Sequence, residues 1–148
     1  MVFRYVRHAQ AIRWFALQTK INDKYDGSIG HFFPRGSVVN VFFGENVGFE
    51  KTGTRPAVVI SNDTINKTSG NIIVAPLTDV ANKAGKKMLS TQYILRKSNN
   101  PFLKMDSIVQ CEDMRVVSKA RVGDLIGFIH PSDKANLDKR IKACFFGP

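Results

Sequence analysis

The sequence has 148 residues, with 22 Lys and Arg against 12 Asp and Glu, and so carries a formal net charge of +10. The length suits one compact domain with one core. Hydrophobic residues make up 43% and charged residues 23%, an ordinary globular composition that excludes a disordered chain. The excess of positive charge favours a nucleic acid or an acidic protein as partner.

Several classes of protein are excluded by the same inspection. The longest apolar runs, such as Ile72 to Leu77, hold about six residues, whereas a membrane span needs roughly 20. Arginines interrupt every apolar stretch near the N-terminus, so no signal peptide is expected. The two cysteines and three histidines show no metal-ligand spacing. We therefore expect no disulfide framework, no metal, no cofactor and a cytoplasmic location.

Residues 1–33 are expected to form an extension, mainly helical. Tyr5, Ala9, Ile12 and Ala16 recur at helical spacing, and Phe15 extends that face. The first 35 residues hold six basic and two acidic side chains and so contribute 6 − 2 = +4 to the charge. The main interpretation is a short helix that packs on the body. A poorly ordered tail and an organellar transit segment remain as alternatives.

From Gly36 onward the hydrophobic pattern is that of strands. The run at 56–60 is short and apolar, as expected for a strand buried on both sides, and Pro76 indicates a sheet edge or a strand end. The predicted strands lie at 37–43, 56–60, 71–77, 92–95, within 106–117 and at 123–129.

A helix is predicted to follow the last strand. Pro131 to Asp133 opens it, with Ser132 as N-cap, and Leu137, Ile141 and Phe145 give it one apolar face. Many short strands with one terminal helix predict a mainly β fold, a small antiparallel barrel with a C-terminal helix and an N-terminal helical extension.

Four motifs occur in a recognisable order. They are EKTGTRP at 50–56, SND at 61–63, VAPLT at 74–78 and EDMR at 112–115. This series resembles the MazF/PemK (Kid) family of toxin endoribonucleases from about Arg35 to the end, and the C-terminal helix fits as well. The resemblance implies an SH3-like barrel of the CcdB/PemK type over residues 34–148.

The resemblance also implies a reaction, which is metal-independent and sequence-specific cleavage of single-stranded mRNA. The 2′-OH of the substrate attacks the adjacent phosphorus and leaves a 2′,3′-cyclic phosphate and a 5′-OH, so only RNA can react. Arg55 and Thr78 occupy the positions of the two central catalytic residues. A planar, permanently charged guanidinium suits a phosphorane, and a hydroxyl at a strand end can donate to a phosphoryl oxygen. Without the resemblance, a salt-bridged arginine and an edge-strand threonine are the plainer interpretations.

Other residues are expected to bind RNA or to support the site. Glu50 could orient Arg55, act as a base, or simply lie in water. Asn66 could bond a base edge or form a turn, and Arg115 could contact a phosphate or pair with Glu112 or Asp113. The remaining candidates are Gly53 and Thr54 in the motif loop and the basic stretch Lys83, Lys86 and Lys87, which suits a phosphate backbone.

The sequence also departs from the family pattern. Ser37 replaces an acidic residue, Asn40 stands at an often aromatic position, and Asp113 replaces a Gln. Trp14 lies in the extension, which the family lacks, and receives no role. By resemblance the partners are an acidic antitoxin and a second copy in a homodimer. The alternative functions are a non-catalytic, CcdB-like toxin that binds gyrase and a relative that binds RNA without cleaving it.

Overall fold

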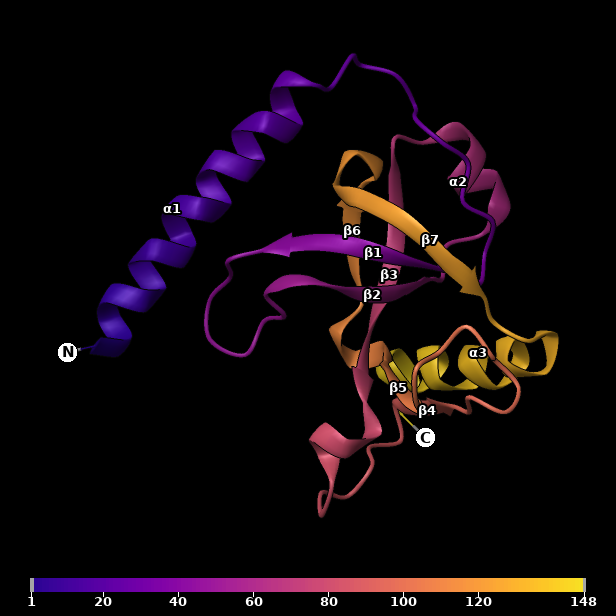
Figure 1. Cartoon of the computed structure of the whole chain (residues 1–148). Helices are drawn as coiled ribbons and strands as arrows, with labels where there is room; N and C mark the ends of the chain where they lie inside the picture. The colour runs from indigo at the N-terminus through magenta and orange to yellow at the C-terminus, as the bar shows by residue number, and fades with distance from the viewer. Residues whose placement is uncertain (1, 148) are drawn as a thin grey trace.

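The computed structural model describes residues 2–147, with side chains described from Tyr5 onward. The chain is mainly antiparallel β sheet with a helix at each end (Figure 1). The elements in chain order are α1 (Val2–Asp23), β1 (Ser37–Gly44), β2 (Gly53–Val59), α2 (Asp63–Thr68), β3 (Asn71–Asp79), the 3-10 turn η1 (Val80–Lys83), β4 (Gln92–Leu95), β5 (Ser107–Gln110), η2 (Cys111–Asp113), β6 (Arg115–Ser118), η3 (Lys119–Arg121), β7 (Val122–Phe128) and α3 (Pro131–Phe146).

The described strands form one bent sheet in the order β4-β5-β3-β2-β1-β7, and β6 pairs with β3 beside this path. β3 pairs with β2 along one edge, while its other edge pairs first with β6 and then with β5. The sheet curls around the core without closing, so the fold is only roughly barrel-like (Figure 1). The predicted fold class, mainly β with a C-terminal and an N-terminal helix, is confirmed.

Two strand predictions need correction. Pro76 is neither at an edge nor at a strand end, because it lies buried inside β3. Val74 before it pairs with Arg115 of β6, and Leu77 after it pairs with Val109 of β5. The sheet tolerates a proline at this change of partner. The same change explains why the segment 106–117 holds two strands separated by η2 rather than one.

The sheet buries both of its faces, as predicted for the apolar run of β2. Val38 and Val58 point into one cluster, whereas Val39, Ala57 and Val59 point into the other. Because side chains alternate along a strand, consecutive apolar residues must fill two separate cores. The first cluster also packs against α3. The second is closed by Phe33 in the segment before β1, by Val117 of β6 and by Val122 of β7.

The C-terminal helix differs in detail from its prediction. Its N-cap is His130, whose side chain accepts from the backbone N–H of Ser132, and Pro131 takes the first turn. Leu137 is buried and Ile141 packs on the core, as expected, but Phe145 is 68% exposed. The sequence pattern does not predict the short helix α2, because residues 61–63 are typical of a turn. In the structure Asn62 is the N-cap of this helix.

The N-terminal helix is present, but it contacts the body with an unexpected face. Trp14, Leu17 and Ile21 are half-buried, whereas Ile12 and Phe15 of the predicted face are 69% and 71% exposed. In Figure 1 α1 projects from the sheet at the upper left, and the irregular segment 24–36 leads from it into β1. Among the described residues, no helix is both long and apolar enough to cross a membrane.

Candidate active site

The two residues expected to carry catalysis lie just beyond the paired part of two neighbouring strands. β2 and β3 pair from Val59 and Val74 to Ala57 and Pro76. Arg55 and Thr78 each lie two residues beyond the last of these pairs, Arg55 beside Val41 of β1 and Thr78 beside Ile108 of β5. Both side chains line one pocket of about 570 Å³, so residues 23 positions apart in the sequence (78 − 55) share a site.

The pocket combines polar groups with an apolar floor. Its polar lining includes Arg55, Thr78, Asn82, Lys104 and Ser107, together with the carboxylate of Asp79. Its apolar lining consists of residues from the strands and from the loop before β5, namely Val38, Pro56, Leu77, Phe102, Leu103 and Ile126. Such a pocket offers donors to a phosphate and an apolar surface to a nucleobase.

Among the described residues, Arg55 makes a side-chain hydrogen bond through its Nε atom only. Its Nε donates to the carbonyl of Thr52 at 3.1 Å, which fixes the base of the guanidinium. Within the described part of the chain, neither a hydrogen bond nor an ion pair engages its two Nη atoms. These two nitrogens are therefore left to bind two oxygens of one anion.

Glu50 and Arg115 lie away from this pocket, in a second hollow of about 240 Å³. Glu50 accepts from the backbone N–H of Val47 at 3.2 Å and so holds its own loop instead of orienting Arg55. Arg115 lies over the ring of Phe43, with its guanidinium carbon 5.8 Å from the centroid. No ion pair joins it to a carboxylate among the described residues, so of the two roles left open by the sequence, the contact with a phosphate stays a prediction.

Asn66 is fully buried and holds the bend at Ser61. Its Nδ2 donates to the carbonyl of Ser61 at 2.9 Å, and its Oδ1 accepts from the Ser61 hydroxyl. A side chain enclosed in this way cannot present its amide to a base edge. The expected turn from Asn66 onward is not observed either, because Asn66 lies inside α2 and its side chain holds the bend at Ser61 that precedes this helix.

The basic stretch lies on the turn that follows β3. Lys83 ends η1, and Lys86 and Lys87 are exposed just beyond it. Asn82, next to Lys83, lines the main pocket. The three lysines thus lie on the turn that begins beside the pocket, where Lys83 is half-buried and Lys86 and Lys87 are exposed.

Gly53 and Thr54 contact the extension. With Trp14 and Gly44 they line a hollow of about 210 Å³ between α1 and the ends of β1 and β2. Gly44 has φ +88°, and a Cβ on it would lie 2.3 Å from the indole of Trp14. Only glycine fits here. The guanidinium carbon of Arg121 lies over the Trp14 ring, 5.1 Å from its centroid.

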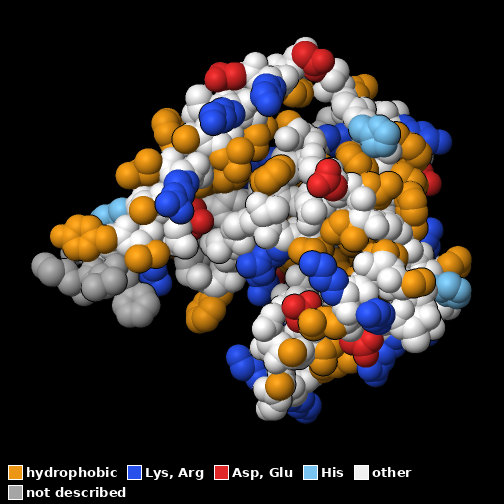
Figure 2. Space-filling model, viewed as in Figure 1, with side chains coloured by type: hydrophobic (Ala, Val, Ile, Leu, Met, Phe, Trp, Pro, Cys, Tyr) orange, Lys and Arg blue, Asp and Glu red, His pale blue; other side chains and the backbone are white. Residues whose placement is uncertain are grey.

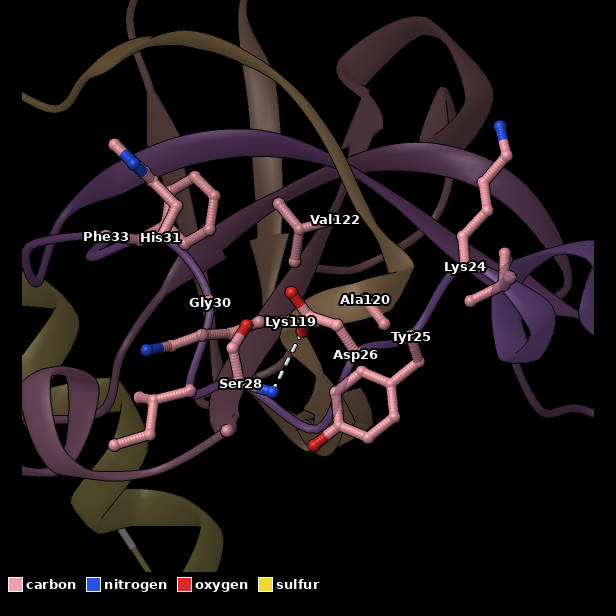
Figure 3. Close-up of a pocket in the computed structure, with 13 residues that line it drawn as sticks. Lys24, Tyr25, Asp26, Ser28, Gly30, His31, Phe33, Lys119, Ala120 and Val122 are labelled. Carbon is pink, nitrogen blue, oxygen red and sulfur yellow. Dashed lines mark hydrogen bonds between the residues drawn. The ribbon is translucent and has the colours of Figure 1, made fainter.

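A further hollow, of about 300 Å³, lies between the segment 24–36, which precedes β1, and η3 (Figure 3). Asp26 accepts from the backbone N–H of Ser28 there, and the hydrogen bonds from Ser28 lower the pKa of Asp26. Lys119 donates to the carbonyl of Asn66 at 2.6 Å, and burial lowers its pKa. Lys119 is thus bonded within the fold, and the other lysine that lines this hollow, Lys24, is exposed to solvent.

Other reactive groups do not form a site. Burial raises the pKa of the Cys111 thiol to about 12, which keeps it from acting as a nucleophile near neutral pH. In the part of the chain that the structure describes, no three His, Cys, Asp or Glu side chains gather as metal ligands. Asp79, Asn82, Lys104 and Ser107 were missed from the sequence because they carry no motif and join the pocket only through the bend of β3 and the loop before β5.

Comparison with known proteins places most of the chain in one family. The sequence model of one family, described as PemK-like, MazF-like toxin of type II toxin-antitoxin system, matches residues 34–145. Endoribonuclease MazF of Staphylococcus epidermidis is 34% identical over 107 residues, which cover 72% of this chain and 86% of that protein. The protein of the same name from Staphylococcus saprophyticus is 36% identical over 100 residues, covering 68% and 78%.

Solved structures show the same fold. MazF of Deinococcus radiodurans superposes with a TM-score of 0.62 at 18% identity, covering 77% of this chain and 96% of that one. An endoribonuclease from a mycobacterial species, solved in complex with its cognate antitoxin, gives a TM-score of 0.60 at 18% identity, covering 78% and 97%. Residues 2–33, with α1, lie outside the family match.

Proposed function

Because the chain belongs to the PemK-like, MazF-like toxins of type II toxin–antitoxin systems, an endoribonuclease family, we propose that it cleaves single-stranded mRNA at the pocket of Arg55 and Thr78. The observation that carries this proposal is the pairing of an arginine with unengaged Nη atoms and a threonine hydroxyl in one pocket. We further propose that the reaction needs no metal and that it takes place in the cytoplasm, where mRNA is available.

The reaction we propose is an internal transfer at phosphorus. The 2′-oxygen forms a bond to the adjacent phosphorus, the bond from phosphorus to the 5′-oxygen breaks, and the products are a 2′,3′-cyclic phosphate and a 5′-OH. One proton leaves the 2′-OH and one reaches the departing 5′-oxygen. Arg55 stabilises the extra negative charge of the phosphorane, and Thr78 donates to a phosphoryl oxygen and orients the reacting group.

The surroundings of the pocket suit an RNA strand. Lys104 lines it, and Lys83, Lys86 and Lys87 lie on the adjoining turn, where they can contact neighbouring phosphates. Phe102 offers an aromatic ring on which a base can stack. We also propose that the chain acts as a homodimer and that an acidic antitoxin silences it by binding over the same cationic surface.

The test is cleavage of single-stranded RNA in EDTA by the parent, Arg55→Ala and Thr78→Ala. We expect the parent to cleave and Arg55→Ala to be slower by about 100- to 1,000-fold, the usual cost of losing a donor to a developing charge. Arg140→Ala is a matched control, because this arginine donates from α3 to the carbonyl of Ser90 and does not line the pocket.

Two outcomes would overturn the proposal. A parent that does not cleave RNA, or variants at both positions that cleave as fast as the parent, excludes catalysis at this pocket. Toxicity that survives Arg55→Ala without RNA fragments would indicate a gyrase-binding toxin. RNA binding by a parent that leaves the strand intact would indicate a non-cleaving relative.

A further inference from the structure

A further polar residue, Asn40 of β1, lines the pocket of Arg55 and Thr78. Asn40 is half-buried, and within the described part of the chain no hydrogen bond engages its side-chain amide. Neither atom of this amide is enclosed by the protein. The lining of the pocket therefore carries an open hydrogen-bond donor and an open acceptor on one side chain.

Asn40 faces the pocket because of its place in β1. Val38 also lines the pocket and belongs to the first core cluster, whereas Val39 belongs to the second. Side chains alternate along a strand, so Asn40 shares the face of Val38. In the register of β1 with β2, Asn40 lies opposite Pro56, the neighbour of Arg55. Backbone pairing thus fixes the amide one strand away from the strand that carries Arg55.

The loop before β5 places an aromatic ring beside the same part of β1. Phe102 lines the pocket, and a Cβ on Gly127 of β7 would lie 2.5 Å from its ring, so only glycine leaves room for the ring there. Gly127 pairs with Val38 of β1. Asn40 follows Val38 by two residues, about 7 Å along an extended strand. The ring and the amide thus lie at neighbouring points of the pocket.

We propose that Asn40 determines which base the pocket accepts, by hydrogen bonds from its amide to the edge of that base, while Phe102 stacks on the face of the base. Recognition of single-stranded RNA commonly combines these two contacts. Every base has a face that can stack, whereas the order of donors and acceptors along the edge differs between bases. The amide, not the ring, therefore supplies the selectivity.

The other polar groups of the pocket are less suited to select a base. Asp79, Asn82 and Lys104 are exposed, so water replaces any hydrogen bond that a mismatched base fails to make. The hydroxyl of Ser107 already donates to a backbone carbonyl at 3.1 Å. Asn40 is partly withdrawn from water, where an amide left unpaired against the wrong base costs more.

Asn40 also departs from the family pattern, in which this position is often aromatic. An aromatic ring there would add a stacking surface, but no neighbouring pair of donor and acceptor atoms. We therefore expect base selection at this point to be a property of this chain rather than of the family.

This inference rests on the proposed function for its ligand, since both place RNA in the same pocket. In Figure 2, Lys and Arg side chains lie on the lower part of the molecule, where Figure 1 places the turn after β3. Cations there can hold the RNA backbone while the pocket holds one base. Binding and cleavage can be measured separately, because RNA with 2′-O-methyl groups lacks the 2′-OH nucleophile.

The test uses the full-length protein and two pools of single-stranded RNA that share a short randomised stretch. One pool has ordinary ribose, and the other has 2′-O-methyl groups throughout. Sequencing of the retained strands of the second pool gives the base preference of binding, and the fragment ends of the first, in EDTA, give that of cleavage. We expect one position at which the parent prefers one base by about tenfold or more in both pools.

Variants assign this preference to a side chain. Asn40→Leu keeps the size but removes donor and acceptor, so the preference at that position should fall to about twofold or less. Asn40→Asp offers acceptors only and should enrich guanine there, because guanine alone has two neighbouring donors on its Watson–Crick edge.

Two further variants separate selection from general binding. Phe102→Leu should weaken binding of every base about equally, by about tenfold, because stacking does not distinguish bases. Asn99→Leu is the matched control, since Asn99 is exposed on the loop before β5 and does not line the pocket. Circular dichroism compares the folding of all variants, and Asn40→Asp decides the question if Asn40→Leu does not fold.

Three results would overturn the inference: a parent without base preference in the 2′-O-methyl pool, a preference that Asn40→Leu leaves unchanged, and a folded Asn40→Leu that loses binding of all bases equally. A parent that selects a base through Asn40 but leaves ordinary RNA intact would support the inference and refute the proposed function. A parent that cleaves RNA with a preference independent of Asn40 would do the opposite. A parent that binds no RNA would overturn both.

Discussion

Residues 34–145 and the N-terminal helix use apolar side chains in opposite ways. In β1, β2 and β3 consecutive apolar residues point into two different cores, so Val58 and Ile72 are fully buried. In α1 the apolar residues at helical spacing point outward, while Trp14 and its neighbours make the attachment. The first region closes its apolar residues into cores and lines a pocket, whereas the second leaves several of its apolar residues exposed.

The largest difference should appear in stability, when the same change is made in each region. Ile72→Ala should lower the free energy of unfolding by about 2–5 kcal/mol, because it leaves a cavity in a closed core. Ile12→Ala should change it by less than about 0.5 kcal/mol, because the side chain is 69% exposed. Urea unfolding of the two variants measures both values. Equal costs would show that α1 is part of the core.

The next effect concerns the shape of the cation in the pocket. Arg55→Lys keeps the charge but replaces a planar fork by a point donor, so we expect kcat to fall by about tenfold or more. Arg140→Lys on α3 serves as the control. If the Arg55→Lys variant is as fast as the parent, then Arg55 supplies charge alone and does not bind two phosphate oxygens.

A smaller effect is expected at Thr78. Thr78→Val keeps the shape of the side chain but removes the hydrogen-bond donor. One hydrogen bond contributes roughly 1 kcal/mol, so kcat should fall by about fivefold. Thr78→Ser restores the hydroxyl and should recover most of the rate. If Ser is as slow as Val, then the methyl group and its packing matter more than the hydroxyl.

The smallest effect should follow deletion of residues 1–30. Since Arg55 and Thr78 lie in the matched region and Phe33 of the second core is retained, RNA cleavage should change by less than about twofold. Cleavage by the truncated and full-length chains is compared directly. Loss of folding after truncation would contradict the separation of the two regions.

The sequence was sufficient to predict most strands and both terminal helices from their hydrophobic period, and its family resemblance pointed to Arg55 and Thr78, which line one pocket. It was not sufficient for the partner change at Pro76, which depends on how β3 is shared between β5 and β6. Nor did it show that Glu50 lies in a separate hollow. Glu50 instead accepts from the backbone N–H of Val47, three residues earlier, and the motif does not predict this turn of the loop.

The orientation of α1 could not be predicted for a similar reason. Spacing identified a face through Tyr5, Ile12 and Phe15, but both sides of this helix carry apolar residues. The close fit of Trp14 against Gly44, with Arg121 over the indole, decides which side is seated. Trp14 and Gly44 lie 30 positions apart in the sequence (44 − 14), so no local sequence pattern predicts their contact.

The central claim, that the pocket of Arg55 and Thr78 uses the 2′-OH of RNA, is tested most directly by end-group analysis. The parent is incubated in EDTA with a single-stranded RNA and with DNA of the same sequence. We predict fragments with 2′,3′-cyclic phosphate and 5′-OH ends from the RNA, and an intact DNA strand. Cleavage of the DNA, or RNA fragments that carry 5′-phosphate ends, would contradict the claim.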